Sequence, residues 1–464
     1  MPVRKYTYYD YTLSLCPQCL KRIDAKIVFE DEKVYMLKRC PDHGNSRVLI
    51  ADDVHYYKNI RNYNKPSETP YHFNTKTHYG CPYDCGLCPD HEQHSCLTII
   101  EITDRCNLTC PTCYAGSSPS HGRHRTLDEV KQMLDTIVRN EKEPDVVQIS
   151  GGEPTLHPHF FEILDYAKSL PIKHLMVNTN GITIARDPAF ALRLKNYMPD
   201  FEIYLQFDSF SDDALFMLRG AHLREIREQA IANLNALNLS TTLVVTLQKG
   251  LNDGEIGDII RYALKQKCIR GVTFQPTQIA GRLEHFNEET DRITLTEVRR
   301  KILEQTDIFN SDDLIPVPCN PDALMMGYVL KLDGAYFPLT RYINPTDLLD
   351  NSRNTIVYEQ DEQLHQKMFE IFSTGTSTDK ASSKLHHLLC CLPAVEAPDL
   401  GYDNLFRIIV MQFIDAYNFD VRSIKKSCVH IVNKDNKIIP FETMNLFYRD
   451  DKITYLEELR AQTP

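Results

Sequence analysis

The chain has 464 residues, a formal net charge of -11 and an isoelectric point near 5.9. Hydrophobic residues make up 42% and charged residues 25%, the usual balance of a globular protein, and the length predicts one large domain with smaller ones attached. The acidic balance excludes the basic face of a nucleic-acid-binding protein, and no apolar stretch has the length of a membrane span or a signal peptide. We therefore expect a cytoplasmic protein with no nucleic-acid partner and no integral membrane segment.

Cysteine is the residue type that says most about function. In a reducing compartment the 15 cysteines are expected to bind metals rather than to form disulfides. Cys268 stands alone, and the others fall into four groups: Cys16, Cys19 and Cys40; Cys81, Cys85, Cys88 and Cys96; Cys106, Cys110 and Cys113; and Cys319, Cys390, Cys391 and Cys428. This clustering favours several metal centres.

Residues 1–60 predict a small knuckle domain with short strands. Cys16 and Cys19 lie in one turn, CPQC, while Cys40 and His43 lie in a second turn, CPDH. Two pairs of ligands from two turns suit a tetrahedral ion, and the pattern resembles a rubredoxin or a zinc ribbon. We predict a structural site for one zinc or one iron ion, which the sequence does not distinguish.

Residues 61–97 are rich in cysteine and loop residues and have little apolar periodicity, so a metal must supply much of their folding energy. The stretch GCPYDCGLCPDHEQHSC offers four thiolates, from Cys81, Cys85, Cys88 and Cys96. Four soft ligands on one loop predict a closed auxiliary 4Fe-4S cluster. Zinc is the alternative metal, and His91 or His94 is the alternative to Cys96 as the fourth ligand.

Residues 98–300 continue as an alternation of apolar strands and amphipathic helices, whose first strand begins at Leu97. The expected strands are 97–103, 146–150, 174–181, 202–209, 241–247 and 271–277, and the expected helices are 127–138, 159–170, 188–197, 223–237 and 256–266. About six βα units predict an α/β fold whose parallel sheet curls into a full or partial TIM-like (β/α)6 barrel with helices outside. In such folds the chemistry lies at the carboxyl ends of the strands.

Residues 301–464 predict a carboxyl-terminal α+β extension of mixed helices and strands. Cys319, Cys428 and one or both of Cys390 and Cys391 would converge on a second auxiliary cluster. The alternative is that they are buried free thiols, because cysteine is a good core residue.

The loop DRCNLTCPTCYAG, at 104–116, places Cys106, Cys110 and Cys113 just after the first expected strand. Three thiolates can bind three irons of a 4Fe-4S cluster and leave the fourth iron open to another molecule. An open metal position is typical of sites that bind and activate a substrate. The alternative is a zinc knuckle with a distant fourth ligand, although zinc sites favour a CxxC spacing.

The array CNLTCPTCY, with its aromatic Tyr114, and the GGEP sequence after the second strand resemble the radical S-adenosylmethionine (SAM) enzymes. The resemblance implies that GGEP binds the amino group of SAM, and that role is carried over to Gly151, Gly152, Glu153 and Pro154. Other strand ends offer further polar groups; Asn178, Asn180 and Asp208 are expected in the pocket, with Gln206, Thr246, Gln275 and Pro276 near it. Each of these also has a simpler interpretation as a helix cap or turn residue.

In this family the amino and carboxylate groups of SAM chelate the open iron. The resemblance implies reductive cleavage of SAM to methionine and a 5'-deoxyadenosyl radical, which abstracts hydrogen from an unactivated C-H bond. It also implies a low-potential electron donor of the ferredoxin or flavodoxin type.

Nearly the whole chain resembles one branch, the 7,8-dihydro-6-hydroxymethylpterin methyltransferase-like proteins, which include archaeal tetraether lipid synthases. The shared stretches are the knuckle, GCPYDCGLCPDH, the loop at Cys319 and the stretch 406–431. The branch implies several metal centres and either methyl transfer to a pterin or the joining of lipid chains, so the substrate is a small molecule or a lipid. This chain departs from the pattern where it has Ala323 and Glu442 in place of expected cysteines.

Two functions of other classes compete with this enzyme. A non-catalytic iron-sulfur protein, either an electron carrier or a redox sensor, would explain the clusters but not GGEP with an open iron. A zinc-based interaction module would bind zinc and contain neither iron nor sulfide.

Overall fold

The computed structural model of the protein describes residues 4–65, 68–332, 334–341, 344, 402–449 and 452–463. None of the helices in these ranges is long and apolar enough to cross a membrane.

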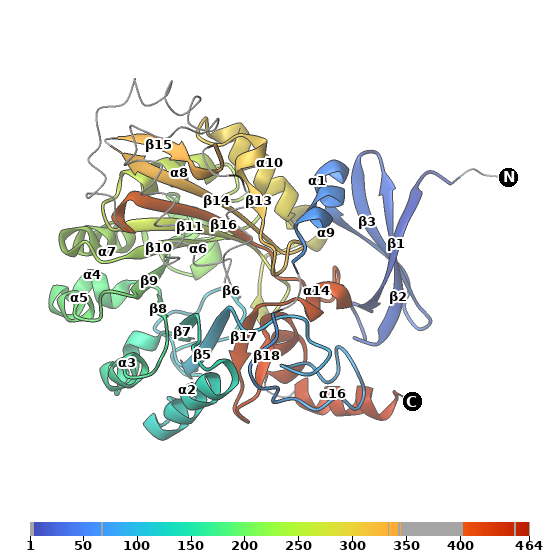
Figure 1. Cartoon of the computed structure of the whole chain (residues 1–464), viewed down its shortest axis with the longest axis horizontal. Coiled ribbons are helices and arrows are strands. Elements are labelled where there is room, and N and C mark those ends of the chain that lie inside the picture. The colour runs from blue at the N-terminus through green and yellow to red at the C-terminus, as the bar shows by residue number, and fades with distance from the viewer. Residues whose placement is uncertain are drawn as a thin grey trace, which may run out of the picture.

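The knuckle domain is an antiparallel sheet at one end of the molecule, drawn in blue in Figure 1. Its strands are β1 (Thr7–Leu15), β2 (Arg22–Glu30), β3 (Lys33–Cys40) and β4 (Gly44–Ala51), followed by α1 (Val54–Asn59) and the 3-10 turn η1 (Ile60–Tyr63). Lys38 fastens this domain to the rest of the chain. Its buried Nζ donates to the carbonyl of Leu15 at 2.9 Å, and to the carbonyls of Ala416 and Tyr417 at 2.8 and 2.7 Å.

A parallel sheet forms the centre of the molecule and confirms the predicted α/β fold. Its strands, each hydrogen-bonded to the next in this order, are β5 (Leu97–Thr103), β7 (Val146–Gly151), β8 (His174–Thr179), β9 (Phe201–Gln206), β10 (Thr241–Leu247) and β11 (Ile269–Pro276). The connecting helices are α2 (Leu127–Glu141), η2 (Pro154–Leu156), α3 (Phe160–Lys168), α4 (Ile182–Arg186), α5 (Pro188–Lys195), α6 (Asp212–Arg219), α7 (Arg224–Leu237) and α8 (Ile256–Lys265). This order is that of a partial (β/α)6 barrel.

Side chains alternate along these strands, and the two faces of the sheet have different neighbours. On β5, Ile100 and Ile102 belong to the core beneath the helices, whereas Leu97 and Ile99 belong to a second core on the inner face. The helices are amphipathic, and each buries one apolar side. In α2, Thr126 and Glu129 form a capping box, and the buried stripe includes Val130, Met133, Leu134 and Ile137.

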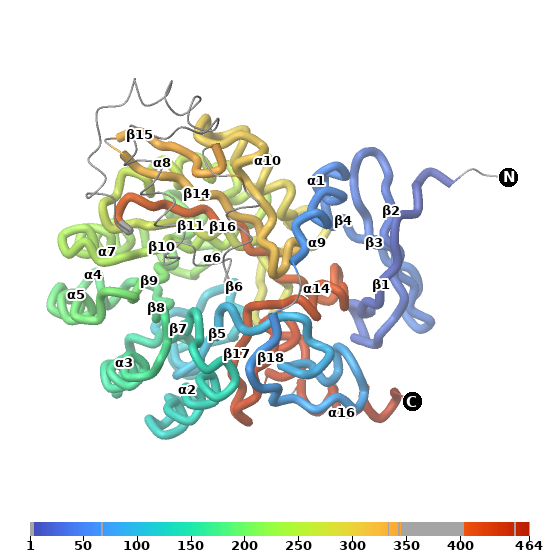
Figure 2. The backbone as a smooth tube through the Cα atoms, viewed as in Figure 1, coloured from blue at the N-terminus to red at the C-terminus, as the bar shows by residue number. Residues whose placement is uncertain are grey.

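The carboxyl-terminal region adds strands to both edges of this sheet. β16 (Leu405–Met411) runs parallel to β11 at one edge, and β17 (Val429–Val432) runs parallel to β5 at the other. Figure 2 shows the red carboxyl-terminal tube beside both edges. The extension expected from the sequence therefore shares the barrel sheet instead of forming a separate layer.

The remaining elements surround this framework. They are β6 (Thr112–Cys113), β12 (Arg282–Leu283), α9 (Glu288–Asp291), α10 (Leu295–Gln305), η3 (Ser311–Asp313), β13 (Ile315–Pro316), β14 (Leu324–Leu332), β15 (Ala335–Pro338), η4 (Leu339–Arg341), η7 (Tyr402–Asn404), α14 (Val421–Lys425), β18 (Ile438–Pro440), α15 (Phe441–Thr443), the π-helix Met444–Tyr448 and α16 (Lys452–Ala461).

Candidate active site

A large cavity opens at the carboxyl ends of the parallel strands. Its open space, including the mouth, is about 1310 Å³. The residues that end the strands line it, among them Gly151, Asn178, Gln206, Thr246 and Gln275. Cys106, Cys110 and Cys113 also line the cavity, so the fold places the three loop thiols where barrel enzymes carry their chemistry.

The cysteine loop that follows β5 is fastened by backbone contacts and by Arg282. This arginine donates from Nε to the carbonyl of Cys110 at 2.6 Å and from Nη2 to the carbonyl of Ser117 at 2.7 Å. Arg282 is also paired with Cys113 in the short β6–β12 ladder. Burial raises the pKa of the Cys106 thiol to about 12 and also raises that of Cys110. Burial thus favours the neutral thiols, whereas a bound cation stabilises thiolates and would lower these pKa values again.

The GGEP residues have two different positions. Gly151 and Gly152 line the cavity, but a Cβ on either would lie 2.2 Å from a backbone oxygen, that of Thr103 or of Arg105. These glycines therefore let the end of β7 approach the start of the cysteine loop, and the Gly152 amide donates to the Thr103 carbonyl at 2.8 Å.

Glu153 is buried behind the wall and is engaged by the protein itself. Its Oε1 accepts from the Thr155 and Thr179 hydroxyls at 2.6 and 2.7 Å, and its Oε2 accepts from the Asn180 amide at 2.8 Å. Neither Glu153 nor Pro154 is among the described residues that line the cavity. Burial raises the pKa of Glu153, against the lowering effect of these hydrogen bonds. In this geometry Glu153 orients the β8 end instead of projecting into the cavity.

Tyr114, Asn178 and Asn180 line the cavity as expected from the sequence. The Asn180 side chain donates to Asn107 Oδ1 at 2.7 Å, and its Nδ2 lies 4.0 Å from Cys106 Sγ. It thus joins the β8 end to the cysteine loop. The Tyr114 ring packs against Phe441 with centroids 4.9 Å apart.

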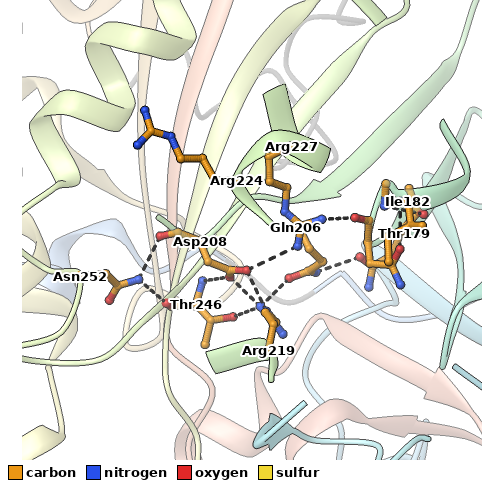
Figure 3. A network of polar contacts seen from close by, with 12 residues as sticks. Thr179, Ile182, Gln206, Asp208, Arg219, Arg224, Arg227, Thr246 and Asn252 are labelled. Atoms are coloured by element: carbon orange, nitrogen blue, oxygen red, sulfur yellow. Dashed lines mark hydrogen bonds and ion pairs between the residues drawn. The ribbon is translucent and has the colours of Figure 1, made fainter. Parts of the chain in front are cut away.

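Asp208 is fully buried and acts through Arg219, as Figure 3 shows. The Arg219 guanidinium donates to the two carboxylate oxygens of Asp208 at 2.6 and 2.7 Å, and also to Gln206 and Thr246 at 2.9 and 2.8 Å. Burial alone would raise the pKa of Asp208, but the Arg219 charge outweighs it and holds the pKa below its ordinary value. Asp208 is not among the described residues that line the cavity, whereas Arg219 is.

Arg227 is the most informative residue that the sequence reasoning missed. It is 1% exposed and lines the cavity, and its Nη1 donates to the Asn180 carbonyl. Its Nε and Nη2 have no hydrogen-bond partner among the described residues; Nη2 lies 4.0 Å from Asp208 Oδ2. A buried guanidinium with donors to spare suits a ligand carboxylate, and burial lowers its pKa to about 10.

The sequence contains a signal for this arginine. Along α7 the buried residues are Arg227, Ala230, Ile231 and Leu234, so the arginine occupies the apolar stripe of the helix. A charged residue at such a position needs a partner, which is a reason to suspect a site.

The knuckle residues Cys16, Cys19, Cys40 and His43 converge as expected, with ligand atoms all within 4.8 Å of one another. Their spacing fits a tetrahedral ion.

The auxiliary group predicted from Cys81, Cys85, Cys88 and Cys96 is divided in the structure. The first three line a small cavity together with His91, whereas Cys96 lies with Cys319 and Cys428. The reason is strand register: β5 and β17 pair in parallel with Leu97 opposite Val429, which places the preceding residues, Cys96 and Cys428, side by side. Cys390 and Cys391 lie outside the described residues.

The residues around the main cavity fit both groups that the resemblance implies. Three thiols on one face are the donor set of a cluster with an open iron. The unpartnered nitrogens of Arg227 and the strand-end amides are polar partners for the amino-acid part of SAM.

Parts of the chain match known families and proteins. The radical SAM superfamily matches residues 100–263, and the HMPTM N-terminal zinc ribbon domain matches residues 8–52. The chain is 29% identical over 197 residues to the GTP 3',8-cyclase of Limosilactobacillus fermentum, covering 41% of this chain and 57% of that protein. Streptococcus suis SuiB bound to S-adenosylmethionine is a similar structure, with 18% identity, a TM-score of 0.38 and coverage of 46% of this chain and 47% of that one.

A longer match covers nearly the whole chain. The 7,8-dihydro-6-hydroxymethylpterin dimethyltransferase of Methanocaldococcus jannaschii is 32% identical over 489 residues, covering 95% of this chain and 94% of that protein. With the three loop thiols at the mouth of a (β/α)6 barrel, this match shows that the chain is a radical SAM enzyme of the same family as that dimethyltransferase.

Proposed function

We propose that this enzyme binds SAM beside a 4Fe-4S cluster held by Cys106, Cys110 and Cys113, and that it methylates an unactivated carbon of a reduced pterin. When bound, the cluster and one SAM would supply one-electron reductive cleavage of a carbon-sulfur bond, giving methionine and a 5'-deoxyadenosyl radical able to take hydrogen from a C-H bond. A second SAM would donate the methyl group, take up a second electron and leave as S-adenosylhomocysteine. The observation that carries the proposal is the placement around one cavity of the three thiols and of Arg227, whose Nε and Nη2 have no hydrogen-bond partner among the described residues.

The chain's own residues position SAM in this proposal. The donors of Arg227 take the carboxylate, which replaces their missing partners and compensates the buried charge. Asn178 and Asn180, at the end of β8, lie on the same side of the cavity as the cysteine loop and offer amide groups to the amino end. Arg219, held by Asp208, adds positive charge beside Cys110 and Cys113.

The rest of the cavity lining supports a pterin as the substrate. It includes aromatic rings, from Tyr204, Phe413 and Phe441, and the amide groups of Gln148 and Gln275. A planar heterocycle uses both, by stacking on rings and by hydrogen bonding at its edges. A lipid chain would use the apolar surface and leave the amides without partners.

The other metal sites complete the proposal. Cys81, Cys85 and Cys88 would hold an auxiliary 4Fe-4S cluster, with His91, which lines the same small cavity, as the candidate fourth ligand. The knuckle would hold zinc, since the matching domain is a zinc ribbon. A low-potential protein of the ferredoxin or flavodoxin type would reduce the enzyme, and we expect it to act in the cytoplasm.

The test is anaerobic reconstitution with iron and sulfide, followed by SAM, dithionite and 7,8-dihydro-6-hydroxymethylpterin. We expect 5'-deoxyadenosine and a pterin product heavier by one methyl group or more, both measured by mass spectrometry. The triple variant of Cys106, Cys110 and Cys113 to alanine should form neither and should lose about one cluster of iron and sulfide. Cys268→Ala, a buried cysteine outside these sites, is the matched control and should behave like wild type.

The outcomes separate the alternatives. Formation of 5'-deoxyadenosine without pterin methylation would keep the SAM chemistry and reject the pterin, and lipid precursors would then be the next substrates to assay. Absence of 5'-deoxyadenosine in a fully loaded wild type would favour an electron carrier or redox sensor. Cleavage that persists in the triple variant would contradict the role given to the loop.

A further inference from the structure

Cys96, Cys319 and Cys428 meet in the buried interior, next to the wall of the main cavity. They are 1%, 6% and 1% exposed. The Sγ atoms of Cys319 and Cys428 are 3.1 Å apart, and all three sulfurs lie within 4.8 Å of one another. The three residues come from distant parts of the sequence, so the fold itself assembles this group.

Well-ordered segments hold each thiol. Cys96 and Cys428 precede the paired strands β5 and β17, and the Leu97 amide donates to the Cys428 carbonyl at 3.1 Å. Cys319 lies in the connection from β13 to β14, where the next residue, Asn320, exchanges side-chain contacts of 3.3 and 3.5 Å with Ser423. Three separate backbone segments therefore bring the sulfurs together.

The sulfurs of Cys319 and Cys428, 3.1 Å apart, are closer together than the thiolates around a single ion, and far closer than those around a cluster, so of the two a single ion needs the smaller separation. A tetrahedral ion with bonds of about 2.3 Å holds two thiolates about 3.8 Å apart. The knuckle provides an internal standard, because Cys19 Sγ and Cys40 Sγ are 3.8 Å apart. A four-iron cluster bonds each thiolate to a different iron and spreads them further. In the described part of the chain, the knuckle and this group alone bring three or more ligand atoms within 4.8 Å; the cavity-loop thiols do not.

We propose that Cys96, Cys319 and Cys428 bind a single thiophilic divalent cation, of which Zn²⁺ is the type, rather than an iron-sulfur cluster. This replaces the second auxiliary cluster expected from the sequence. It is independent of the proposed function, because it rests on sulfur spacing alone.

The site would differ from the knuckle in one respect. Three protein ligands leave a fourth position of a tetrahedral ion for water or an added ligand. Among the described residues no fourth ligand atom lies within 4.8 Å of all three sulfurs, although His94 Nε2 is 3.5 Å from Cys96 Sγ. Leu97 and Val429, each next to a ligand in sequence, line the main cavity. The ion would therefore fix the position of that wall by tying β5, β17 and the β13–β14 connection together.

The test is metal analysis of the full-length protein after anaerobic reconstitution with iron, sulfide and Zn²⁺. We expect Cys319→Ala and Cys428→Ala each to lose about one zinc ion per chain and no sulfide, while Cys268→Ala loses nothing. Loss of iron and sulfide in the amounts of a cluster would overturn the proposal. Retention of all metal in both variants would overturn it as well.

A second measurement avoids dependence on the stability of these variants. In a chain carrying Cys16→Ala and Cys40→Ala, which disrupts the knuckle site, the zinc X-ray absorption spectrum reports the remaining ion and does not respond to iron. We expect three sulfur ligands at about 2.3 Å. A spectrum with nitrogen and oxygen ligands only, or no bound zinc, would contradict the proposal. Neither result depends on SAM cleavage, so a failure of the proposed function is seen separately.

Discussion

The knuckle domain and the cavity loop both present cysteine thiols to a metal, but they surround it differently. In the knuckle, three thiols and His43 face one point with all their ligand atoms within 4.8 Å, so the chain itself can fill a tetrahedral shell. In the loop, Cys106, Cys110 and Cys113 line an open cavity together with the strand ends and Arg227. A metal whose ligands all come from the chain contributes folding energy. A metal with an open ligand position is available for chemistry.

The largest effect should come from emptying the knuckle. Cys16→Ala with Cys40→Ala should lose one zinc ion and unfold residues 4–63 locally, because structural zinc supplies about 10 kcal/mol or more to such a domain. Hydrogen exchange should show lost protection in β1 to β4, α1 and η1 only, with 5'-deoxyadenosine formation retained.

That result would sharpen the contrast between a structural and a catalytic site. If protection were also lost in the barrel strands, contacts such as those of Lys38 with Ala416 and Tyr417 and of Asp52 with Thr296 would transmit the damage, and the two regions would not be separable.

Asp208→Ala should have the next largest effect, because it leaves the Arg219 charge buried without its partner. Loss of one member of a buried pair costs about 3–5 kcal/mol of unfolding free energy. Since folding lowers the pKa of Asp208 below its ordinary value of 3.8, its contribution is present above that pH and is lost as the pH falls through the lowered pKa. Denaturant unfolding of wild type and variant should therefore differ at pH 7 and converge in acid. Equal stability at pH 7 would contradict this account of the network.

Arg227→Met should weaken SAM binding by about 10- to 100-fold, the value of a charge-assisted hydrogen bond of about 1.5–3 kcal/mol. Arg224→Met is the matched control, because Arg224 lies one turn earlier on α7 with a side chain that is 61% exposed. Binding can be measured anaerobically by calorimetry on reconstituted protein. Equal affinities for the two variants would remove Arg227 from the proposed carboxylate site.

Thr126→Ala should have the smallest effect. It removes the cap of α2, which costs about 1 kcal/mol of unfolding free energy, on the outer face of the sheet. Iron and sulfide content should be unchanged. A loss of cluster would show that the outer helices and the cysteine loop are coupled more closely than the geometry indicates.

Local patterns in the sequence were enough to predict much of the fold. The strands from β5 to β11 were predicted because apolar runs alternate with amphipathic helices over short distances. The cysteine loop was recognisable because its three thiols lie within eight residues of sequence, 106–113.

Features that depend on distant segments were not predictable. The separation of Cys96 from Cys81, Cys85 and Cys88 follows from the register of β5 against β17, which no local pattern records. The same holds for β16 and β17, which flank the parallel strands on either side; their apolar runs do not reveal which neighbours they pair with. Arg227 was missed because the helical pattern around it is regular, although its position on the apolar stripe was visible.

The pairing of β5 with β17 also determines when the main cavity can be completed during synthesis. Residues 97–103, which form β5, leave the ribosome long before residues 429–432, which form β17. The hydrogen bonds between β5 and β17 can form only after both segments have been made. Contacts of such long sequence separation form slowly. The cavity wall that includes Leu97, Val429 and Phe441 is therefore completed late, so the loop thiols of the nascent barrel face an unfinished cavity until the carboxyl-terminal strands join the sheet.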